Sequence, residues 1–125
     1  MILVDTSVWI DHLHTTEPNL VALLQTDEAG THPGVIEELA VGSITQRHEF
    51  LDWLAQLTAF PVLSHTELLA LVEHHHLWGV GLSPIDVQLL GAVLLLPGSA
   101  LWTRDARLQR AASRVGVPLR ESTGQ

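Results

Sequence analysis

Acidic side chains follow two apolar runs of the sequence at the point where each run ends. Asp5 comes directly after Ile2–Val4, and Asp105 lies just past the run at 100–103. Continuous apolar runs of this kind are typical of strands that are buried on both faces of a parallel sheet. In open α/β sheets, ligands bind in the crevice beyond the carboxyl ends of the strands. We therefore expect Asp5 and Asp105 to face a common crevice.

Two further acids are expected near the same edge. Asp86 lies in the first turn of a helix that Pro84 begins, and Glu37 or Glu38 lies on a helix that starts at the same edge. Clustered carboxylates repel one another unless a cation neutralises them, and such hard oxygen ligands suit Mg²⁺ or Mn²⁺. The pattern therefore predicts a metal site.

Each aspartate also has a purely structural interpretation, because acidic side chains often cap the first turn of a helix. Asp5 and Asp105 each precede an expected helix, and Asp86 stands three residues after Ser83, which is the spacing of a capping box. The choice between Glu37 and Glu38 stays open on geometry, since neighbouring helix positions differ by about 100° and both flank the apolar face.

Strand and helix patterns alternate along the chain, and this predicts an α/β fold. We expect three layers, α/β/α, around a mainly parallel sheet of about four to five strands. The expected strands lie at 2–4, 29–34, 60–63, 100–103 and 117–119, with Pro61 marking a sheet edge. The expected helices run from Val8 to Leu13, from Pro18, from Val35, over 45–57, from Ser64, over 84–96 and over 106–115.

Length and composition indicate one compact domain. The chain has 125 residues, 46% of them hydrophobic and 16% charged, which fits a single domain over 1–125. No apolar stretch approaches the roughly 20 residues of a membrane span, and no secretion signal begins the sequence. Cysteine and lysine are both absent. We therefore expect a cytoplasmic protein without disulfides or a thiol nucleophile.

The histidines are weaker candidates for chemistry. His74, His75 and His76 are consecutive, so on a helix they point about 100° apart and cannot converge on one metal. His32 lies in a loop near the predicted crevice, and we expect it to be exposed to solvent.

Four segments together resemble the PIN-domain ribonucleases, specifically the VapC-type toxins of toxin-antitoxin pairs. They are VDTSVWI at 4–10, VIEELAVG at 35–42, LSPID at 82–86 and LWTRDARL at 101–108. The resemblance implies a PIN-like, Rossmann-like domain, a Mg²⁺- or Mn²⁺-dependent endoribonuclease, a homodimer and inhibition by a cognate VapB-type antitoxin. It places the acidic quartet on Asp5, Glu38, Asp86 and Asp105, with Ser7 and Thr103 as hydroxyl neighbours. It favours Glu38 over Glu37 because the family's acid stands directly before Leu-Ala.

The expected mechanism follows from these residue types. With no cysteine or lysine nucleophile, the attacking group is a metal-activated water aimed at a phosphodiester. Asp5 and Asp86 are the expected principal metal ligands, with Asp105 as a further one. Asp105 and Glu38 are expected to hold a second ion or to position water. Ser7 and Thr103 would orient the carboxylates.

Positive charge is concentrated at the end of the chain. The net charge is −8, yet the residues from 104 onward contain five arginines and only two acids. Arg107, Arg110 and Arg114 fall on one face of the last helix, and with Arg104 they are predicted to contact RNA phosphates. The alternative is an ordinary solvated helix face.

Three other functions are compatible with a short α/β chain that carries acids at the ends of its strands. A phosphoacceptor receiver domain and a haloacid-dehalogenase-type phosphatase both need a lysine, which this chain lacks. The phosphatases also need an acid at the position of Ser7. A catalytically silent PIN-like interaction module remains as the alternative that an activity assay must exclude.

Overall fold

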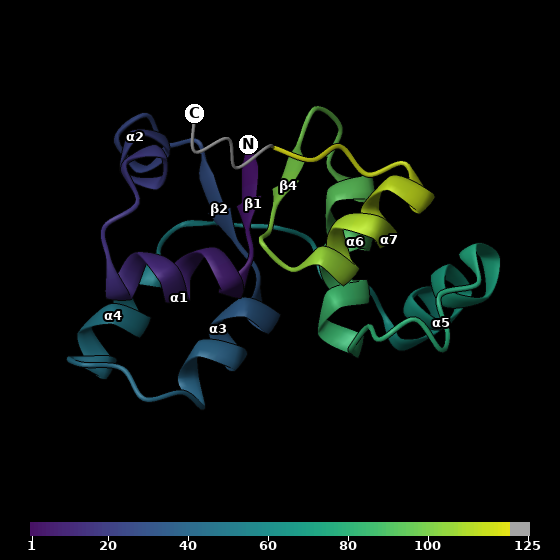
Figure 1. Ribbon diagram of the computed structural model, residues 1–125, viewed down its shortest axis with the longest axis horizontal. Coiled ribbons are helices and arrows are strands. Elements are labelled where there is room, and N and C mark those ends of the chain that lie inside the picture. Colours follow the sequence, from purple (N-terminus) through teal and green to yellow (C-terminus); the bar gives the residue numbers. More distant parts are fainter. Residues whose placement is uncertain (121–125) are drawn as a thin grey trace.

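A four-stranded parallel sheet forms the centre of the computed structural model, which describes residues 1–120. The strands are very short and lie in the order β3-β2-β1-β4 (Figure 1). They comprise β1 (Ile2–Val4), β2 (Ala29–Thr31), β3 (Thr58–Ala59) and β4 (Ala100–Trp102). The first strand is therefore internal, with Leu3 paired to Gly30 on one side and to Leu101 on the other.

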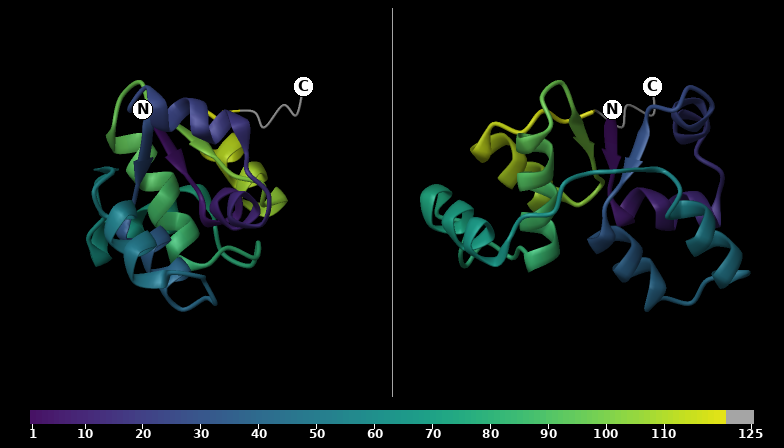
Figure 2. Two further views of the ribbon diagram at one scale, coloured as in Figure 1. Left: turned by 90° about the vertical axis from the view of Figure 1, so that its left-hand side faces the viewer. Right: turned by 180° about the vertical axis from the view of Figure 1, so that it is seen from behind.

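Within residues 1–120, seven helices connect and cover these strands. They are α1 (Thr6–His14), α2 (Pro18–Gln25), α3 (Pro33–Ala40), α4 (Arg47–Leu54), α5 (His65–His75), α6 (Pro84–Leu95) and α7 (Ala106–Val115). Helices lie on both sides of the sheet, and α5 packs against α6 away from the strands (Figures 1 and 2). The predicted α/β class with a parallel sheet is confirmed, and the capping box at Ser64 starts α5 as its sequence indicated. No helix within residues 1–120 is long and apolar enough to cross a membrane.

Two predicted strands are wrong in extent. The strand expected at 60–63 lies instead at Thr58–Ala59, because pairing ends when Phe60 donates its N–H to the Thr31 oxygen (2.7 Å) and Pro61 offers no donor. The strand is at the edge of the sheet, as Pro61 suggested. The strand expected at 117–119 is reduced to a single parallel bridge between Leu119 and Leu101.

The helix predicted at 45–57 is also shorter than expected. It spans Arg47–Leu54, because Gln46 adopts a left-handed conformation (φ 53°) that a helix cannot contain. The Arg47 guanidinium then reaches back and donates to the Ala40 carbonyl from Nε and Nη2 (3.0 and 2.8 Å). This contact closes the loop between α3 and α4.

The buried core holds the end of β1 in a fixed position. Trp9 and Trp102 are fully buried, and Leu3 and Leu101 pack beside them between the helical layers. The Asp5 N–H donates to the Trp102 carbonyl (2.9 Å), which extends the β1–β4 ladder by one residue. The backbone of Asp5 is therefore part of the sheet, and its carboxylate starts from a rigid base.

Candidate active site

Asp5 is buried and its carboxylate is oriented by two hydroxyl groups. Ser7 Oγ and Thr103 Oγ1 both donate to Asp5 Oδ2 at 2.7 Å, and the residue is only 5% exposed. Each hydroxyl is itself fixed, because Ser7 Oγ accepts the Arg104 N–H and Thr103 Oγ1 accepts the Asp105 N–H, both at 3.0 Å. Asp5 does not cap α1 with its side chain, so the capping interpretation of this residue is wrong. Its second oxygen, Oδ1, has no protein hydrogen bond within residues 1–120.

Asp86 and Asp105 both cap helices, yet each does so with one oxygen. Asp86 Oδ2 accepts the Ser83 N–H (2.9 Å) in a complete capping box at the start of α6. Asp105 Oδ1 accepts the Arg107 N–H (2.9 Å) at the start of α7. The other oxygens, Asp86 Oδ1 and Asp105 Oδ2, make no protein hydrogen bond among the described residues. The structural and the chemical interpretations of these acids are therefore compatible.

Glu38 joins the aspartates through a contact that the sequence did not predict. Thr6 Oγ1 donates to Glu38 Oε1 (2.6 Å) across 32 residues of sequence, and Glu38 is partly buried. Glu37 is exposed to solvent. The placement of α1 against α3 thus separates two acids that were equivalent on helix geometry alone. The one sequence signal for Thr6 is its position directly after Asp5.

The charges of these acids act on one another. Burial is the main cause that raises the pKa of Glu38, and the charges of Asp5 and Asp86 raise it further, against the lowering effect of Thr6. Burial likewise raises the pKa of Asp86, with smaller contributions from the charges of Asp5 and Asp105. Accumulated negative charge of this kind is relieved by a bound cation.

The donor set fits Mg²⁺ or Mn²⁺ better than a metal that needs a closed protein cage. Within residues 1–120, no three histidine or acidic side chains are arranged so that they could hold a metal ion by themselves. Mg²⁺ does not require this, because it usually keeps several waters and takes only one or two carboxylates plus substrate phosphate. The free oxygens of Asp5, Asp86 and Asp105 supply hard ligands of the right chemistry.

Comparison with known proteins identifies the family. The PIN domain model matches residues 2–114. The chain belongs to the PIN-domain family. Ribonuclease VapC32 from two strains of Mycobacterium tuberculosis, CDC 1551 / Oshkosh and ATCC 25618 / H37Rv, is 58% identical over 121 residues, covering 97% of this chain and 98% of each relative. The family predicted from the four sequence segments, the VapC-type PIN ribonucleases, is thereby confirmed.

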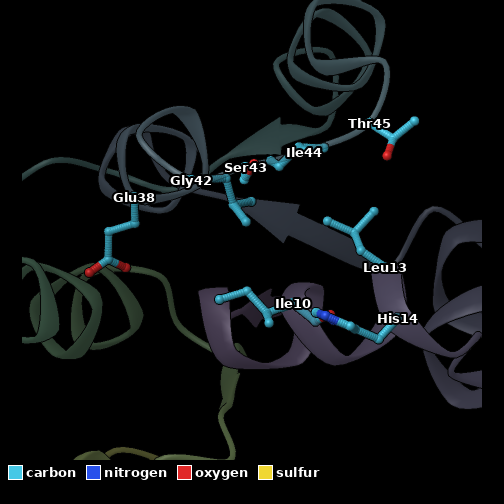
Figure 3. A pocket seen from close by; sticks show the side chains of 9 residues that line it. Ile10, Leu13, His14, Glu38, Gly42, Ser43, Ile44 and Thr45 are labelled. Carbon is cyan, nitrogen blue, oxygen red and sulfur yellow. The ribbon is translucent and has the colours of Figure 1, made fainter.

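A hollow of about 430 Å³ opens beside the acidic crevice of this PIN domain. In Figure 3, Glu38 stands at one end of the hollow, while Ile10, Leu13 and His14 approach from α1 and the loop at 42–45 lies opposite. The exposed fractions of Ile10 and Leu13 are 45% and 42%. The PIN domain therefore exposes an apolar surface next to its acids.

The predicted arginines separate into two groups. Arg104 pairs with Asp11 (2.7 Å) and Glu17 (2.5 Å), so it ties the end of β4 to α1 and to the start of α2. This ion pairing lowers the pKa of Glu17. The remaining three lie exposed on α7 and line a hollow of about 280 Å³, namely Arg107, Arg110 and Arg114. Only this second group presents a row of cations, and Arg104 is left out of the RNA contacts proposed below.

Proposed function

We propose that this PIN domain is a Mg²⁺- or Mn²⁺-dependent endoribonuclease that acts as the toxin of a toxin-antitoxin pair. The observation that supports the proposal is electrostatic: the charges of Asp5 and Asp86 act on Glu38, and those of Asp5 and Asp105 act on Asp86, while each acid keeps one oxygen without a protein hydrogen bond among residues 1–120. The 58% identity to Ribonuclease VapC32 supports the same activity.

The proposed mechanism assigns a task to each carboxylate. A divalent ion, when bound, would supply Lewis-acid chemistry that activates water and offsets charge on the phosphodiester. Asp5 Oδ1, Asp86 Oδ1 and Asp105 Oδ2 are the atoms proposed to hold it. Glu38 Oε2 accepts a proton from the attacking water, a task suited to a carboxylate whose pKa is raised by burial. Ser7 and Thr103 keep Asp5 in position through their 2.7 Å hydrogen bonds.

Asp5→Asn is the direct test of this activity. Asparagine keeps the shape and can still accept the two hydroxyl hydrogen bonds, but it removes the charge that a cation needs. We expect cleavage of single-stranded RNA to fall by orders of magnitude while the melting temperature stays close to that of the parent protein. Asp52→Asn, at an exposed acid on α4, is the matched control and should cleave normally.

The assay also separates an enzyme from a silent interaction module. Parent protein should cleave with Mg²⁺ or Mn²⁺ and stop when EDTA is added. If folded Asp5→Asn protein in EDTA cleaved RNA as fast as the parent protein does with Mg²⁺ or Mn²⁺, the mechanism would be refuted. A parent protein that is inactive with either ion, on a panel of cellular RNAs, would favour the silent module.

The arginine row on α7 is proposed to hold substrate phosphates. Arg107, Arg110 and Arg114 have no acid on their own helix to pair with, since α7 contains none. Affinity for single strands falls with salt at a log-log slope of about −0.7 per neutralised phosphate, so replacing all three with alanine should flatten the slope by roughly 2. An unchanged slope would reduce the row to a solvated helix face.

The proposed partners are a VapB-type antitoxin and a second copy of the chain. Residues 1–103 carry twelve acids and one arginine, so the crevice attracts a basic segment, and the hollow beside Glu38 can accept an apolar side chain. Expression of the chain alone should arrest growth, and co-expression with the antitoxin should restore it. Harmless expression of active, folded protein would contradict the toxin role.

A further inference from the structure

The loop between α5 and α6 runs alongside the arginine row of α7. At one end, Arg114 Nη1 donates to the His76 carbonyl (3.5 Å). At the other end, Gly81 lies so close to Arg107 that a Cβ built on the glycine would stand 2.8 Å from Arg107 Cδ. Between them, Val80 lines the same hollow as the three arginines. The loop and the helix therefore form the two walls of one cationic channel.

An exposed tryptophan lies on the same loop, two residues before Val80. Trp78 is 56% exposed, and its ring lies beside that of His76, at 5.0 Å between centroids. The residues on either side of Val80 have positive φ angles, 69° at Gly79 and 82° at Gly81, so the backbone turns sharply just after the indole. The indole thus projects from a tight turn instead of joining the core.

Both walls of the channel lead to the acidic crevice. The loop wall continues from Gly81 to Ser83, whose hydroxyl and N–H form the capping box with Asp86. The helix wall begins at Asp105, which caps α7. A strand that follows the channel is therefore delivered to two of the four carboxylates.

We propose that Trp78 stacks a base of single-stranded RNA while Arg107, Arg110 and Arg114 hold the neighbouring phosphates. This rests on the proposed function and names the path that the substrate takes. Stacking on an aromatic ring combined with a positively charged groove is how proteins bind single strands with little sequence preference. Arg114 lies nine residue steps after Asp105, which is roughly 14 Å along the helix and about four nucleotides of a stacked strand.

The test measures RNA affinity in EDTA, so that nothing is cleaved. The probe is a fluorescein-labelled single-stranded RNA of about twelve nucleotides, within the usual site size for such grooves. Trp78→Ala should weaken binding roughly five- to a hundred-fold, and Trp78→Phe should restore most of it because the ring is kept. Trp53→Ala is the matched control, since Trp53 is also exposed (42%) but lies on α4. A probe shortened to about two nucleotides on each side of the cut should not distinguish Trp78→Ala from the parent.

Intrinsic tryptophan fluorescence gives a second readout, which compares the parent protein with conservative phenylalanine variants and does not need the alanine variant to fold. RNA should quench part of the parent's tryptophan emission, and the quenching should be lost in Trp78→Phe but kept in Trp53→Phe. Equal affinity and equal quenching in all variants would overturn the proposal. It would also be overturned if Trp78→Ala converted a dimer into a monomer, because the indole would then be buried between copies. If the protein binds RNA through Trp78 but does not cleave it, the nuclease activity is refuted and the proposed RNA channel stands. If the protein cleaves RNA and replacing Trp78 changes neither affinity nor quenching, the channel is refuted and the nuclease activity stands.

Discussion

Thr6→Val isolates the hydrogen bond that holds Glu38. Valine has the same branched shape and the same backbone preference as threonine, so the change removes little besides the hydroxyl. A hydrogen bond to a charged group contributes roughly 1.5–3 kcal/mol, and the partial exposure of Glu38 reduces this to about 1 kcal/mol. For a chain of 125 residues, that loss lowers the melting temperature by about 4 °C.

The same variant should lose activity beyond its loss of stability. Removing the donor leaves Glu38 free to rotate and raises its pKa, since the Thr6 hydrogen bond lowers it. Partners that orient such carboxylates are typically worth ten- to a hundred-fold in activity, so cleavage of labelled RNA in Mg²⁺ should fall by about that factor. Thr6→Ser keeps a hydroxyl and should retain most of both properties. Unchanged melting and unchanged cleavage in Thr6→Val would show that this contact does not position the acid.

Three further predictions concern stability. Folding raises the pKa of Glu38 and Asp86, so in EDTA these two acids stabilise the protein most below their unfolded pKa values of about 4, and this stabilisation is lost as the pH rises through the higher folded values. Denaturant titration at several pH values should show this loss of unfolding free energy, and Asp86→Asn should make the pH dependence weaker. Glu17 has a lowered pKa, so its ion pair stabilises above about pH 4.3 and is lost on acidification; Glu17→Gln should cost about 0.5–1 kcal/mol at pH 7 and nothing at low pH. Gly91→Ala should destabilise by roughly 1–3 kcal/mol, because its Cβ would lie 2.3 Å from the Leu63 side chain; a melting temperature equal to the parent's would show that the core can yield there.

Short local sequence patterns were enough to predict most of the helices and strands. The unbroken apolar run at β1, Pro18 and Pro84 at helix starts, and the capping boxes at Ser64 and Ser83 are properties of a few adjacent residues, and each gave an element in its predicted place. The incorrect predictions concern strands whose extent depends on pairing with a neighbouring strand. The apolar run at 60–63 resembles a strand, yet the strand ends at Ala59, because Phe60 donates the last N–H to Thr31 and Pro61 has none to donate.

The site was predictable in its residue types but not in its contacts. Asp5 and Asp105 could be placed together because parallel strands end at one edge. The choice of Glu38 over Glu37 depends on how α1 lies against α3, which no local pattern encodes, and so does the bond from Thr6. His32 was expected to be exposed, but it is 1% exposed and its Nδ1 accepts the Gly34 N–H (2.9 Å) to cap α3.

The double use of Asp86 and Asp105 has a genetic consequence. Each carboxylate caps a helix with one oxygen and offers the other to the crevice. Asparagine caps helices about as well as aspartate does, and a single G-to-A change in the first codon position converts one into the other. Such alleles would encode chains that fold normally and expose the same surfaces but cut nothing. If the chain acts as the proposed toxin, the inert chains in a cell that makes both forms would compete for the antitoxin, so a mutation that inactivates one gene copy would release the product of another.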